Sequence, residues 1–482
     1  MRHPFLLIAL LWLLPGYAQY SVSPPQELVH YDLNQISDAT IGLQKFYHEL
    51  VRLERGERQK VTIVHIGDSH LQAGFLGGRL RMELQKRFGN AGRGLVFPYR
   101  LAQTNSPLDI RAESSSRWNS TRLIKSNGPF RSGISGHAIQ TQQPDFFLEL
   151  FLRENEEGLD YSFDKVTLFH SKGPGAFACN LTPAPETPRS GGVTKVVTRA
   201  KHHLVSPGEN LSAIAKEHGC TVSQVRFWNQ IKGDLIFPGQ LLIIRYRERI
   251  FVPNRSRGVE FSFDNTQVPQ SNQATSVFFT QTSDRLYLKG HQTQNSQHEF
   301  TLYGLNLENT RQSGILYHMI GINGAQFRHF ERGQQNLMEQ LKELNPDLVI
   351  ISLGTNEAMN SRFSAVTFYK QVDQLVQQMR WNASLANILV TTPPDAKASG
   401  SYVSRNMSSI RSTLTGYARN HGLAFWDFYQ VMGGAGGIQN WATGGLAQQD
   451  LIHLNKTGYE LQATLLFDAL MNGYQAYRSH KP

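Results

Sequence analysis

The sequence predicts an α/β protein built on a doubly wound parallel sheet, with a β-sandwich-like insertion that interrupts it. Two apolar runs, at 61–66 and 348–353, end abruptly in glycine, as strands buried on both faces of a parallel sheet do. Segments with helical periodicity alternate with such runs in both flanking parts of the chain. Between residues 108 and 315, short β-rich runs separated by turn residues are instead typical of an antiparallel sandwich.

Length and composition set the broad class. A chain of 482 residues is too long for one ordinary core, so two or three domains are expected. Its 40% apolar and 18% charged residues are globular values. The net charge of +10 suits an anionic partner, but no dense Lys/Arg run indicates nucleic acid. A solvated basic surface without such a partner is the alternative.

The N-terminus resembles an export signal. Arg2 and His3 precede the apolar run 5–14, and the small residues Gly16 and Ala18 follow it. This order predicts a secretory signal peptide cleaved after Ala18. The run is too short to span a bilayer, although an uncleaved anchor is the alternative. We expect a periplasmic or secreted protein that is not inserted in the membrane after cleavage.

These observations divide the chain into segments. We expect a signal peptide at 1–18, one discontinuous α/β domain at 30–107 and 316–482, and a β-rich inserted domain at 108–315. A smaller unit at 202–245 lies within the insertion.

Local patterns predict the elements in order. Apolar residues at helical spacing predict helices over 35–53, 77–88, 333–344, 365–381, 410–421 and 456–474. Further parallel strands are predicted at 387–391 and 424–427. The insertion carries β-rich runs at 146–152, 166–169, 259–263, 286–288 and 300–303.

Residues suited to nucleophilic catalysis lie at opposite ends of the chain. Ser69 follows the first buried strand, at the sheet edge where open α/β sheets place their sites. A serine hydroxyl needs a base, and His453 with Asp450 three residues before it can supply an oriented one. The alternative for Asp450 is helix capping. His65 is expected to be a sheet histidine rather than a catalyst.

Ester hydrolysis also needs donors for the oxyanion. Three candidates each follow a predicted strand: the amide of Ser69, the amide of Gly324 and the side-chain amide of Asn356. Glu357 is expected to support the Asn356 loop, with catalysis as a minor alternative.

Four blocks in this order carry a family resemblance. Gly67-Asp68-Ser69, Gly324, Gly354-Thr355-Asn356-Glu357 and Asp450-x-x-His453 together resemble the SGNH or GDSL hydrolases. The resemblance implies a Ser-His-Asp triad of Ser69, His453 and Asp450 and the three oxyanion donors above. His70 departs from it, because the family name has leucine there. The segments 321–324 and 392–395 look like the subgroup that acts on acetylated cell-wall glycans.

The unit at 202–245 carries a second resemblance. A strand, two short helices separated by Gly219 and a closing strand after Pro238-Gly239 resemble a LysM module, with His203 where that family usually has tyrosine. The resemblance implies binding of N-acetylglucosamine-containing glycans such as peptidoglycan or chitin. The residues implied are Pro207, Gly208, Glu209, Asn210, Gly233, Asp234, Leu235 and Ile236. A degenerate module that only packs is the alternative.

The sequence therefore predicts an exported serine esterase that removes O-acetyl groups from peptidoglycan. An acetylesterase for another polysaccharide, of the xylan or chitin type, and a non-catalytic wall-binding protein are the alternatives. No cofactor is predicted, and no metal either, because His202 and His203 are adjacent rather than at ligand spacing. The sequence leaves open whether Cys179 and Cys220 pair.

Overall fold

The structure is a computed structural model that describes residues 28–125, 128–153, 158–183, 188–229, 231, 233–255, 261–263, 274–330, 335–397 and 402–480. The predicted signal peptide lies outside these residues. The chain forms two compact units, one containing 192–252 and the other containing 27–191 and 253–482. Among the described residues, no helix combines the length and the apolar character that crossing a bilayer requires.

A six-stranded sheet forms the centre of the larger unit, in the order β1-β19-β18-β17-β2-β16. Its strands are β1 (Ile36–Ser37), β2 (Lys60–Gly67), β16 (Gly314–Gly321), β17 (Leu348–Ser352), β18 (Asn387–Thr391) and β19 (Ala424–Trp426). All neighbours pair in parallel except the edge strand β1, which is antiparallel to β19. Two strands far apart in sequence, β2 and β16, lie side by side, so the inserted segment leaves and re-enters this sheet.

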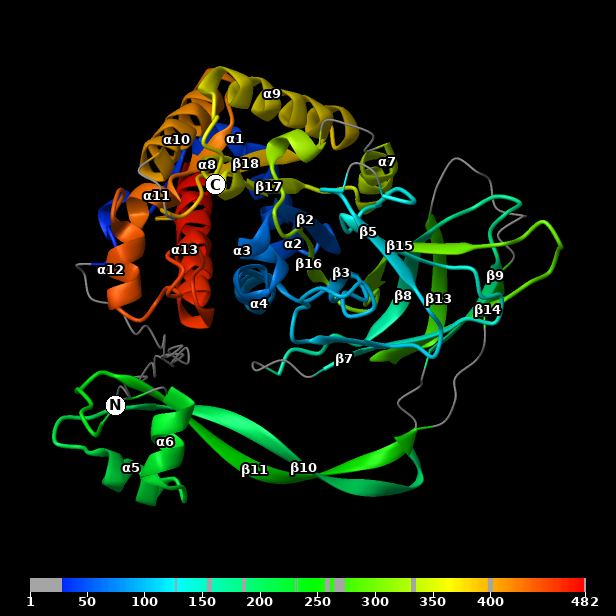
Figure 1. Ribbon diagram of the computed structural model, residues 1–482, viewed down its shortest axis with the longest axis horizontal. Helices are drawn as coiled ribbons and strands as arrows, with labels where there is room; N and C mark the ends of the chain where they lie inside the picture. The colour runs from blue at the N-terminus through cyan, green and yellow to red at the C-terminus, as the bar shows by residue number, and fades with distance from the viewer. Residues whose placement is uncertain are drawn as a thin grey trace, which may run out of the picture. The chain divides into compact units, whose positions relative to one another are not determined.

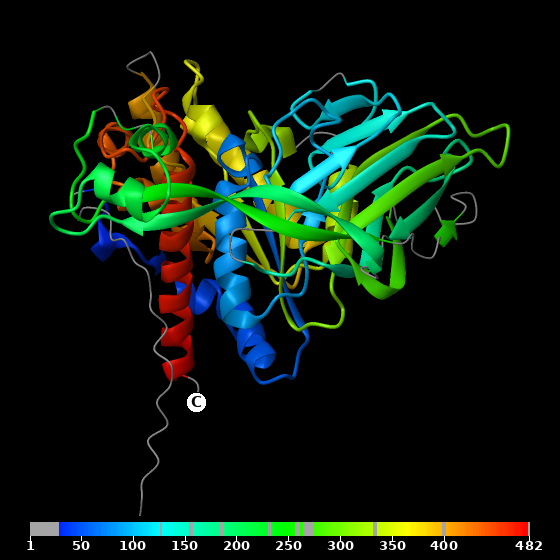
Figure 2. The same cartoon turned by 90° about the horizontal axis from the view of Figure 1, so that it is seen from below.

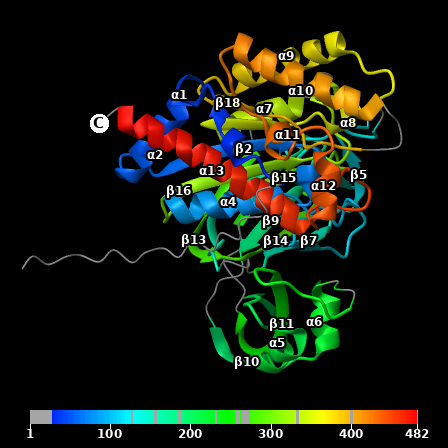
Figure 3. The same ribbon diagram turned by 90° about the vertical axis from the view of Figure 1, so that its left-hand side faces the viewer.

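Helices cover both faces of the sheet, which confirms the doubly wound prediction (Figure 3). Val61 and Ile63 of β2 enter one core, while Val64 and Ile66 enter the other, because successive side chains alternate across a strand. The first core contains α2 (Gln44–Glu54), α4 (Phe75–Phe88) and α13 (Lys456–His480). The second contains α7 (Gln335–Leu344), α9 (Ala365–Asn382) and α10 (Tyr402–Asn420).

The N-terminal helix prediction was wrong at its start. Ile36 pairs with Trp426 in the sheet, and Asp38 has a φ of 57°, which interrupts a helix. The helical residues fall in α1 (Ala39–Gly42) and α2 instead. The remaining short elements are η1 (Tyr31–Leu33), α3 (Ser69–Gln72), η3 (Phe327–Phe330), α8 (Thr355–Ala358), α11 (Phe428–Val431) and α12 (Gly437–Thr443).

Two antiparallel sheets pack beside the α/β part of this unit (Figures 1 and 2). One has the order β12-β9-β14-β7-β4, with β4 (Ile110–Glu113), β7 (Phe147–Leu152), β9 (Ala178–Pro183), β12 (Phe261–Phe263) and β14 (Arg285–His291). The other has the path β13-β8-β15-β6-β5, with β5 (Asn119–Arg122), β6 (His137–Thr141), β8 (Phe163–His170), β13 (Ala274–Ser283) and β15 (Phe300–Glu308). Leu150 and Leu288 of the first sheet share a buried core with Leu168 and Leu305 of the second. This is a sandwich.

The sandwich also uses residues that precede position 108. Strand β3 (Gly94–Val96) pairs with β15, with Val96 opposite Leu305. Leu95 belongs to the core that also holds Ile320 of the parallel sheet. The sandwich is therefore packed continuously against the α/β core.

The smaller unit has the predicted strand-helix-helix-strand order, with β10 (Pro188–Leu204), α5 (Leu211–Glu217), α6 (Val222–Asn229) and β11 (Leu241–Arg255). Gly219 ends the α5 segment with a φ of 63°, a conformation that favours glycine. The Asn229 side chain donates to Val225 O and Ile243 O and accepts from Ile243 N, so it ties α6 to β11. A small core is formed by Val205, Leu211, Ile214, Ala215, Val225, Leu242 and Ile244.

Candidate active site

Ser69 stands at the turn between β2 and α3. Asp68 precedes it and accepts a hydrogen bond from the amide of His70 at 3.0 Å, which caps the short helix. Gly67 ends the strand where a side chain would not fit: a Cβ there would lie 2.9 Å from Leu71 Cβ. The turn therefore presents a partly buried serine at the carboxyl edge of the parallel sheet.

The structure brings the three predicted triad residues together. Ser69 Oγ lies 3.0 Å from His453 Nε2, across 384 positions of sequence. His453 Nδ1 lies 2.7 Å from Asp450 Oδ2. A proton on Nδ1 that is donated to this carboxylate leaves the Nε2 lone pair facing the serine hydroxyl, as a general base requires.

The loop that carries Asp450 and His453 is held by its own backbone. The amides of Ile452 and His453 both donate to Asp450 Oδ1 at 3.0 Å, and Leu451 adopts a φ of 54° between them. Partial burial alone would raise the pKa of Asp450, but the hydrogen bonds from the His453 side chain and these amides lower it below its ordinary value. Asp450 therefore caps its own turn rather than helix α13, which begins at Lys456.

A second histidine lies against the triad. The His70 ring centroid is 5.2 Å from that of His453, and His70 Nδ1 lies 3.0 Å from the Tyr459 hydroxyl. Burial, together with the nearby His453, lowers the pKa of His70 to about 3, so this ring stays neutral beside His453. The sequence carried no signal for this contact, because it depends on how α13 packs against α3.

The glycine turn after β16 lies beside the serine turn. Gln72 Oε1 accepts from the amide of Asn323 at 2.6 Å, and Gly321 packs directly on the Gln72 backbone. Gly324 has a φ of 79°. Within the described residues, the amide N–H groups of Ser69 and Gly324 donate no hydrogen bond, so both are open to an incoming oxygen.

Asn356, the third predicted donor, is engaged in the structure. Its Nδ2 donates to Ala325 O at 3.0 Å and to Asp68 Oδ2 at 3.3 Å. The amide thus lies between the serine turn and the glycine turn. The longer bond to Asp68 is the one that an oxyanion would have to replace.

Two buried carboxyl groups support these turns. Burial raises the pKa of Asp68 to about 7, against the opposing effect of the His70 amide and His453. Burial also raises the pKa of Glu357 to about 8, and Glu357 Oε1 accepts from the amide of Phe327 at 2.7 Å. Glu357 thus joins its loop to η3, as a supporting residue would. Sequence reasoning missed Asp68, because its burial arises only from the packing of distant segments.

A polar hollow of about 100 Å³ lies beside the segments 102–104 and 120–125, which neighbour the glycine turn through two contacts. A Cβ on Gly324 would lie 3.4 Å from Ile124 of the sandwich. Gln72, which holds Asn323, also donates to Thr104 at 2.8 Å. The hollow is lined by Ala102, Gln103, Thr104, Ser120, Thr121, Arg122, Lys125 and His137.

The lining gives this hollow a positive character. It contains Arg122 and Lys125 and no acidic side chain. Burial, aided by Arg122, lowers the pKa of His137 to about 4, although its bond to Ser135 O opposes this. His137 is therefore neutral, and the charge of the hollow comes from the two cations.

His65 occupies the sheet interior, as a sheet histidine would. Its Nε2 lies 2.7 Å from Ser352 Oγ of β17, and its Nδ1 contacts the Tyr317 hydroxyl of β16. Burial lowers the pKa of His65 to about 3.

In the smaller unit, hydrogen bonds join a residue before the first predicted glycan loop to residues that follow the second. Val205 exchanges hydrogen bonds with Gly239 and Gln240, at 2.7 and 2.9 Å. The first loop holds Pro207, Gly208, Glu209 and Asn210, and the second holds Gly233, Asp234, Leu235 and Ile236.

Several of these loop side chains are used within the unit itself. Asn210 caps α5 by accepting from Ala213 N, and Asp234 pairs with Arg226. Leu235 is 69% exposed. Phe227 and Phe237, which sequence reasoning missed, are 82% and 61% exposed and offer flat apolar surfaces to a sugar ring.

Comparison with known proteins agrees with this arrangement. A family model described as GDSL-like Lipase/Acylhydrolase matches residues 293–461, and a LysM domain model matches residues 203–245. The chain therefore contains a GDSL-like acylhydrolase domain and a LysM domain. Both predicted resemblances are confirmed. The matched esterase segment contains Gly324, Asn356 and His453 but not Ser69, which the insertion separates from it.

Individual relatives match to different extents. A structure of a peptidoglycan O-acetylesterase matches 90% of this chain and 96% of that chain, with a TM-score of 0.59 and 20% identity, a level that concerns the fold alone. An acetyl xylan esterase structure is 18% identical over 32% of this chain and 81% of that one, with a TM-score of 0.28. An autolysin of Enterococcus faecalis is 40% identical over 58 residues, which are 12% of this chain and only 8% of that relative.

Proposed function

We propose that this esterase uses Ser69, His453 and Asp450 as its triad and removes O-acetyl groups from peptidoglycan outside the cytoplasm. The observation that carries the triad is the 3.0 Å contact between Ser69 Oγ and His453 Nε2, with Asp450 at 2.7 Å from the other ring nitrogen. This is the geometry of an activated nucleophile.

The reaction follows from these contacts. Ser69 Oγ attacks the acetyl carbonyl carbon while His453 Nε2 accepts the hydroxyl proton. When the tetrahedral intermediate collapses, the bond between the acetyl carbon and the sugar oxygen breaks. His453 returns the proton to that sugar oxygen, and the acetyl group stays on Ser69 as an ester. Water activated by the same imidazole then attacks the acetyl-serine ester, releases acetate and restores the Ser69 hydroxyl.

The oxyanion is stabilised by donors on three turns. The amides of Ser69 and Gly324 are open to an incoming oxygen, and Asn356 Nδ2 can exchange its 3.3 Å bond to Asp68 for one to the oxyanion. Such preorganised donors are a large source of rate acceleration in acyl transfer.

The surroundings favour an anionic polymer over a neutral one. Arg122 and Lys125 line a hollow, and Ile124 between them lies 3.4 Å from the place that a Cβ on Gly324 would take. We infer that a glycan with its acetyl group at Ser69 extends toward both cations. Peptidoglycan carries carboxylates on its peptide stems, whereas the xylan backbone is neutral. The LysM domain adds a second contact with the same polymer and raises its local concentration.

Export completes the proposal. The apolar run 5–14 behind Arg2 is the pattern of a secretory signal, and cleavage after Ala18 would deliver the enzyme to the periplasm or the medium. There the enzyme would meet its polymer directly.

Acetate release tests this function. Purified enzyme and Ser69→Ala are incubated with O-acetylated peptidoglycan, with the same polymer after alkaline de-O-acetylation, and with acetylated xylan. We expect wild type to release acetate from the first polymer most efficiently and Ser69→Ala to release none above background. Equal release by both proteins would refute the triad, and a preference for xylan would refute the substrate.

A further inference from the structure

Three side chains at one end of the LysM domain converge in the manner of metal ligands. His203 is the penultimate residue of strand β10, while Glu217 and His218 lie at the carboxyl end of α5. Nitrogen and oxygen ligand atoms of all three lie within 4.8 Å of one another. We propose that these residues bind a divalent transition-metal ion of the Zn²⁺ type.

The distances fit a shared ion. His203 Nδ1 lies 2.9 Å from His218 Nε2, and Glu217 Oε1 lies 3.8 Å from the same His218 nitrogen. Ligands at zinc distances around a tetrahedron are about 3.3 Å apart. Small side-chain rotations therefore suffice to place all three atoms around one ion, with the fourth position left to water or a glycan oxygen.

A carboxylate behind the site selects the right tautomer of His203. Glu209 Oε2 lies 3.0 Å from His203 Nε2 and also accepts from the amide of Ser206. A proton on Nε2 that is donated to Glu209 leaves Nδ1 with a free lone pair toward His218. Metal-binding histidines have this second-shell carboxylate arrangement. His218 needs only to carry its own proton on Nδ1 to offer Nε2 as well.

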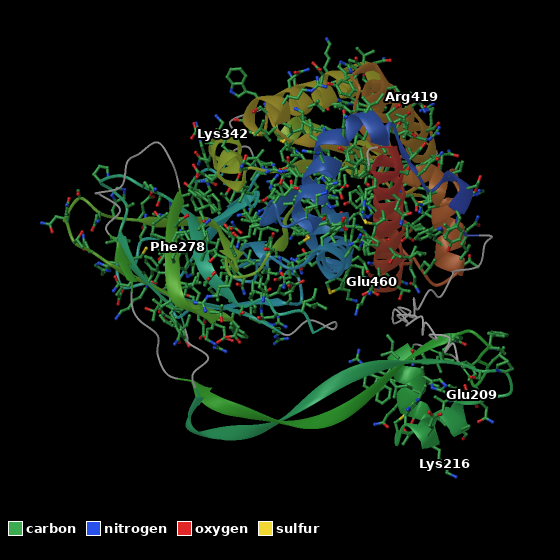
Figure 4. The ribbon with its side chains drawn as sticks, turned by 180° about the vertical axis from the view of Figure 1, so that it is seen from behind. Glu209, Lys216, Phe278, Lys342, Arg419 and Glu460 are labelled. Atoms are coloured by element: carbon green, nitrogen blue, oxygen red, sulfur yellow. The ribbon has the colours of Figure 1, made fainter. Side chains whose placement is uncertain are left out.

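Burial and ligand type favour a metal ion here. The side chains of His203 and His218 are only 12% and 9% exposed, whereas Glu217 at 58% keeps an entry path open. Two imidazoles with one carboxylate suit zinc rather than magnesium or calcium. The ion would join the end of β10 to the end of α5 across a small core, the kind of domain that metals stabilise. It would also hold Glu209, labelled in Figure 4, in the first glycan loop.

The site also gives a role to an otherwise unexplained residue. His203 stands where the LysM family usually has tyrosine, which would not offer this pair of nitrogens. His203→Tyr is therefore the sharpest variant, because it restores the usual family residue and should keep the fold. His218→Gln removes the second nitrogen, and His298→Gln, an exposed histidine of the sandwich, is the matched control.

The test is zinc uptake by the full chain. Tag-free, chelator-treated protein is titrated with Zn²⁺ against a chromophoric competitor, and thermal unfolding is recorded with and without the ion. We expect one equivalent bound and a raised melting temperature for the LysM transition in wild type and His298→Gln. His203→Tyr and His218→Gln should lose both effects.

Cobalt provides an independent readout on the wild-type protein. Co²⁺ in this site should give the visible absorption of a tetrahedral nitrogen–oxygen environment, and Zn²⁺ should abolish that absorption. If wild type takes up no zinc and gives no cobalt spectrum, or if His203→Tyr and His218→Gln bind as wild type does, the proposal is wrong. Acetate release from a small soluble ester should be unaffected by zinc at this site.

Discussion

The sheet edge that carries Ser69, which we propose to be the catalytic edge, and the LysM domain bring their polar groups together in opposite ways. Ser69 and His453 are 384 positions apart and meet only because β2 and the loop before α13 reach the same sheet edge. His203 and His218 are 15 positions apart and meet within one small unit. The catalytic edge therefore depends on the packing of the whole α/β domain, and the LysM cluster depends on a short stretch of chain.

This contrast extends to burial. Asp68 and Glu357 lie behind the catalytic turns and are 1% and 5% exposed, which explains their raised pKa values. In the LysM loops, Glu209 and Asp234 remain near solvent, paired with His203 and Arg226. Substitutions at the edge should thus change chemistry, and substitutions in the LysM domain should change polymer retention.

The largest expected effect on activity comes from a substitution at the catalytic edge of the sheet. Asp450→Asn keeps the shape of the loop but removes the carboxylate that orients His453, so we expect kcat for acetate release to fall by roughly 10³- to 10⁴-fold. Sedimentation with insoluble peptidoglycan measures retention on the same samples and should be unchanged. A parallel loss of retention would mean that the two regions are not independent.

A substitution in the glycine turn should lower kcat by a smaller factor, and a control can separate this loss from the effect of backbone strain. Gly324→Ala adds a Cβ at a φ of 79° and 3.4 Å from Ile124, which should displace the oxyanion amide and lower kcat by about 10²-fold. Gly56→Ala is the matched control, since Gly56 has a φ of 70° with open space around it. Both variants should lose about 1 kcal/mol of stability, and only Gly324→Ala should lose activity.

Asp68 predicts a pH effect on stability. Its pKa is about 7 in the folded protein and ordinarily 3.8, so between these values the folded state holds a proton that the unfolded chain has released. The free energy of unfolding therefore falls as pH rises through this window, by up to about 1.4 kcal/mol per pH unit from this group. Asp68→Asn removes that contribution, so urea unfolding at several pH values should show a shallower decline than wild type. Identical slopes would mean that Asp68 titrates normally.

The smallest expected effect concerns the cationic hollow. The double variant Arg122→Gln, Lys125→Gln should raise KM for intact O-acetylated peptidoglycan several-fold and leave kcat/KM for a small neutral acetyl ester unchanged. Glycan strands stripped of their peptides should show no difference between variant and wild type. An equal change on the small ester would assign these residues to the structure rather than to the polymer.

Predictions from the sequence were more accurate where contacts are local than where they join distant segments. The two LysM helices were predicted closely, because their caps and their core are local, whereas strands β10 and β11 extend well beyond the predicted unit at 202–245. The helix expected from 35 failed at Ile36, whose partner Trp426 lies 390 positions away, and α10 begins at Tyr402, earlier than the predicted 410. The residues proposed for the triad and the oxyanion hole were visible as ordered motifs. The burial of Asp68 and the contact of His70 with His453 were not, since they arise only when distant helices pack.

The most direct test of the central claim is covalent labelling of Ser69 by a fluorophosphonate probe, followed by peptide mapping. Wild type should be labelled at Ser69 at neutral pH, and His453→Ala, which removes a base 384 positions away, should be labelled at least ~10²-fold more slowly. Equal labelling rates for the two proteins, or labelling at another serine, would contradict the account.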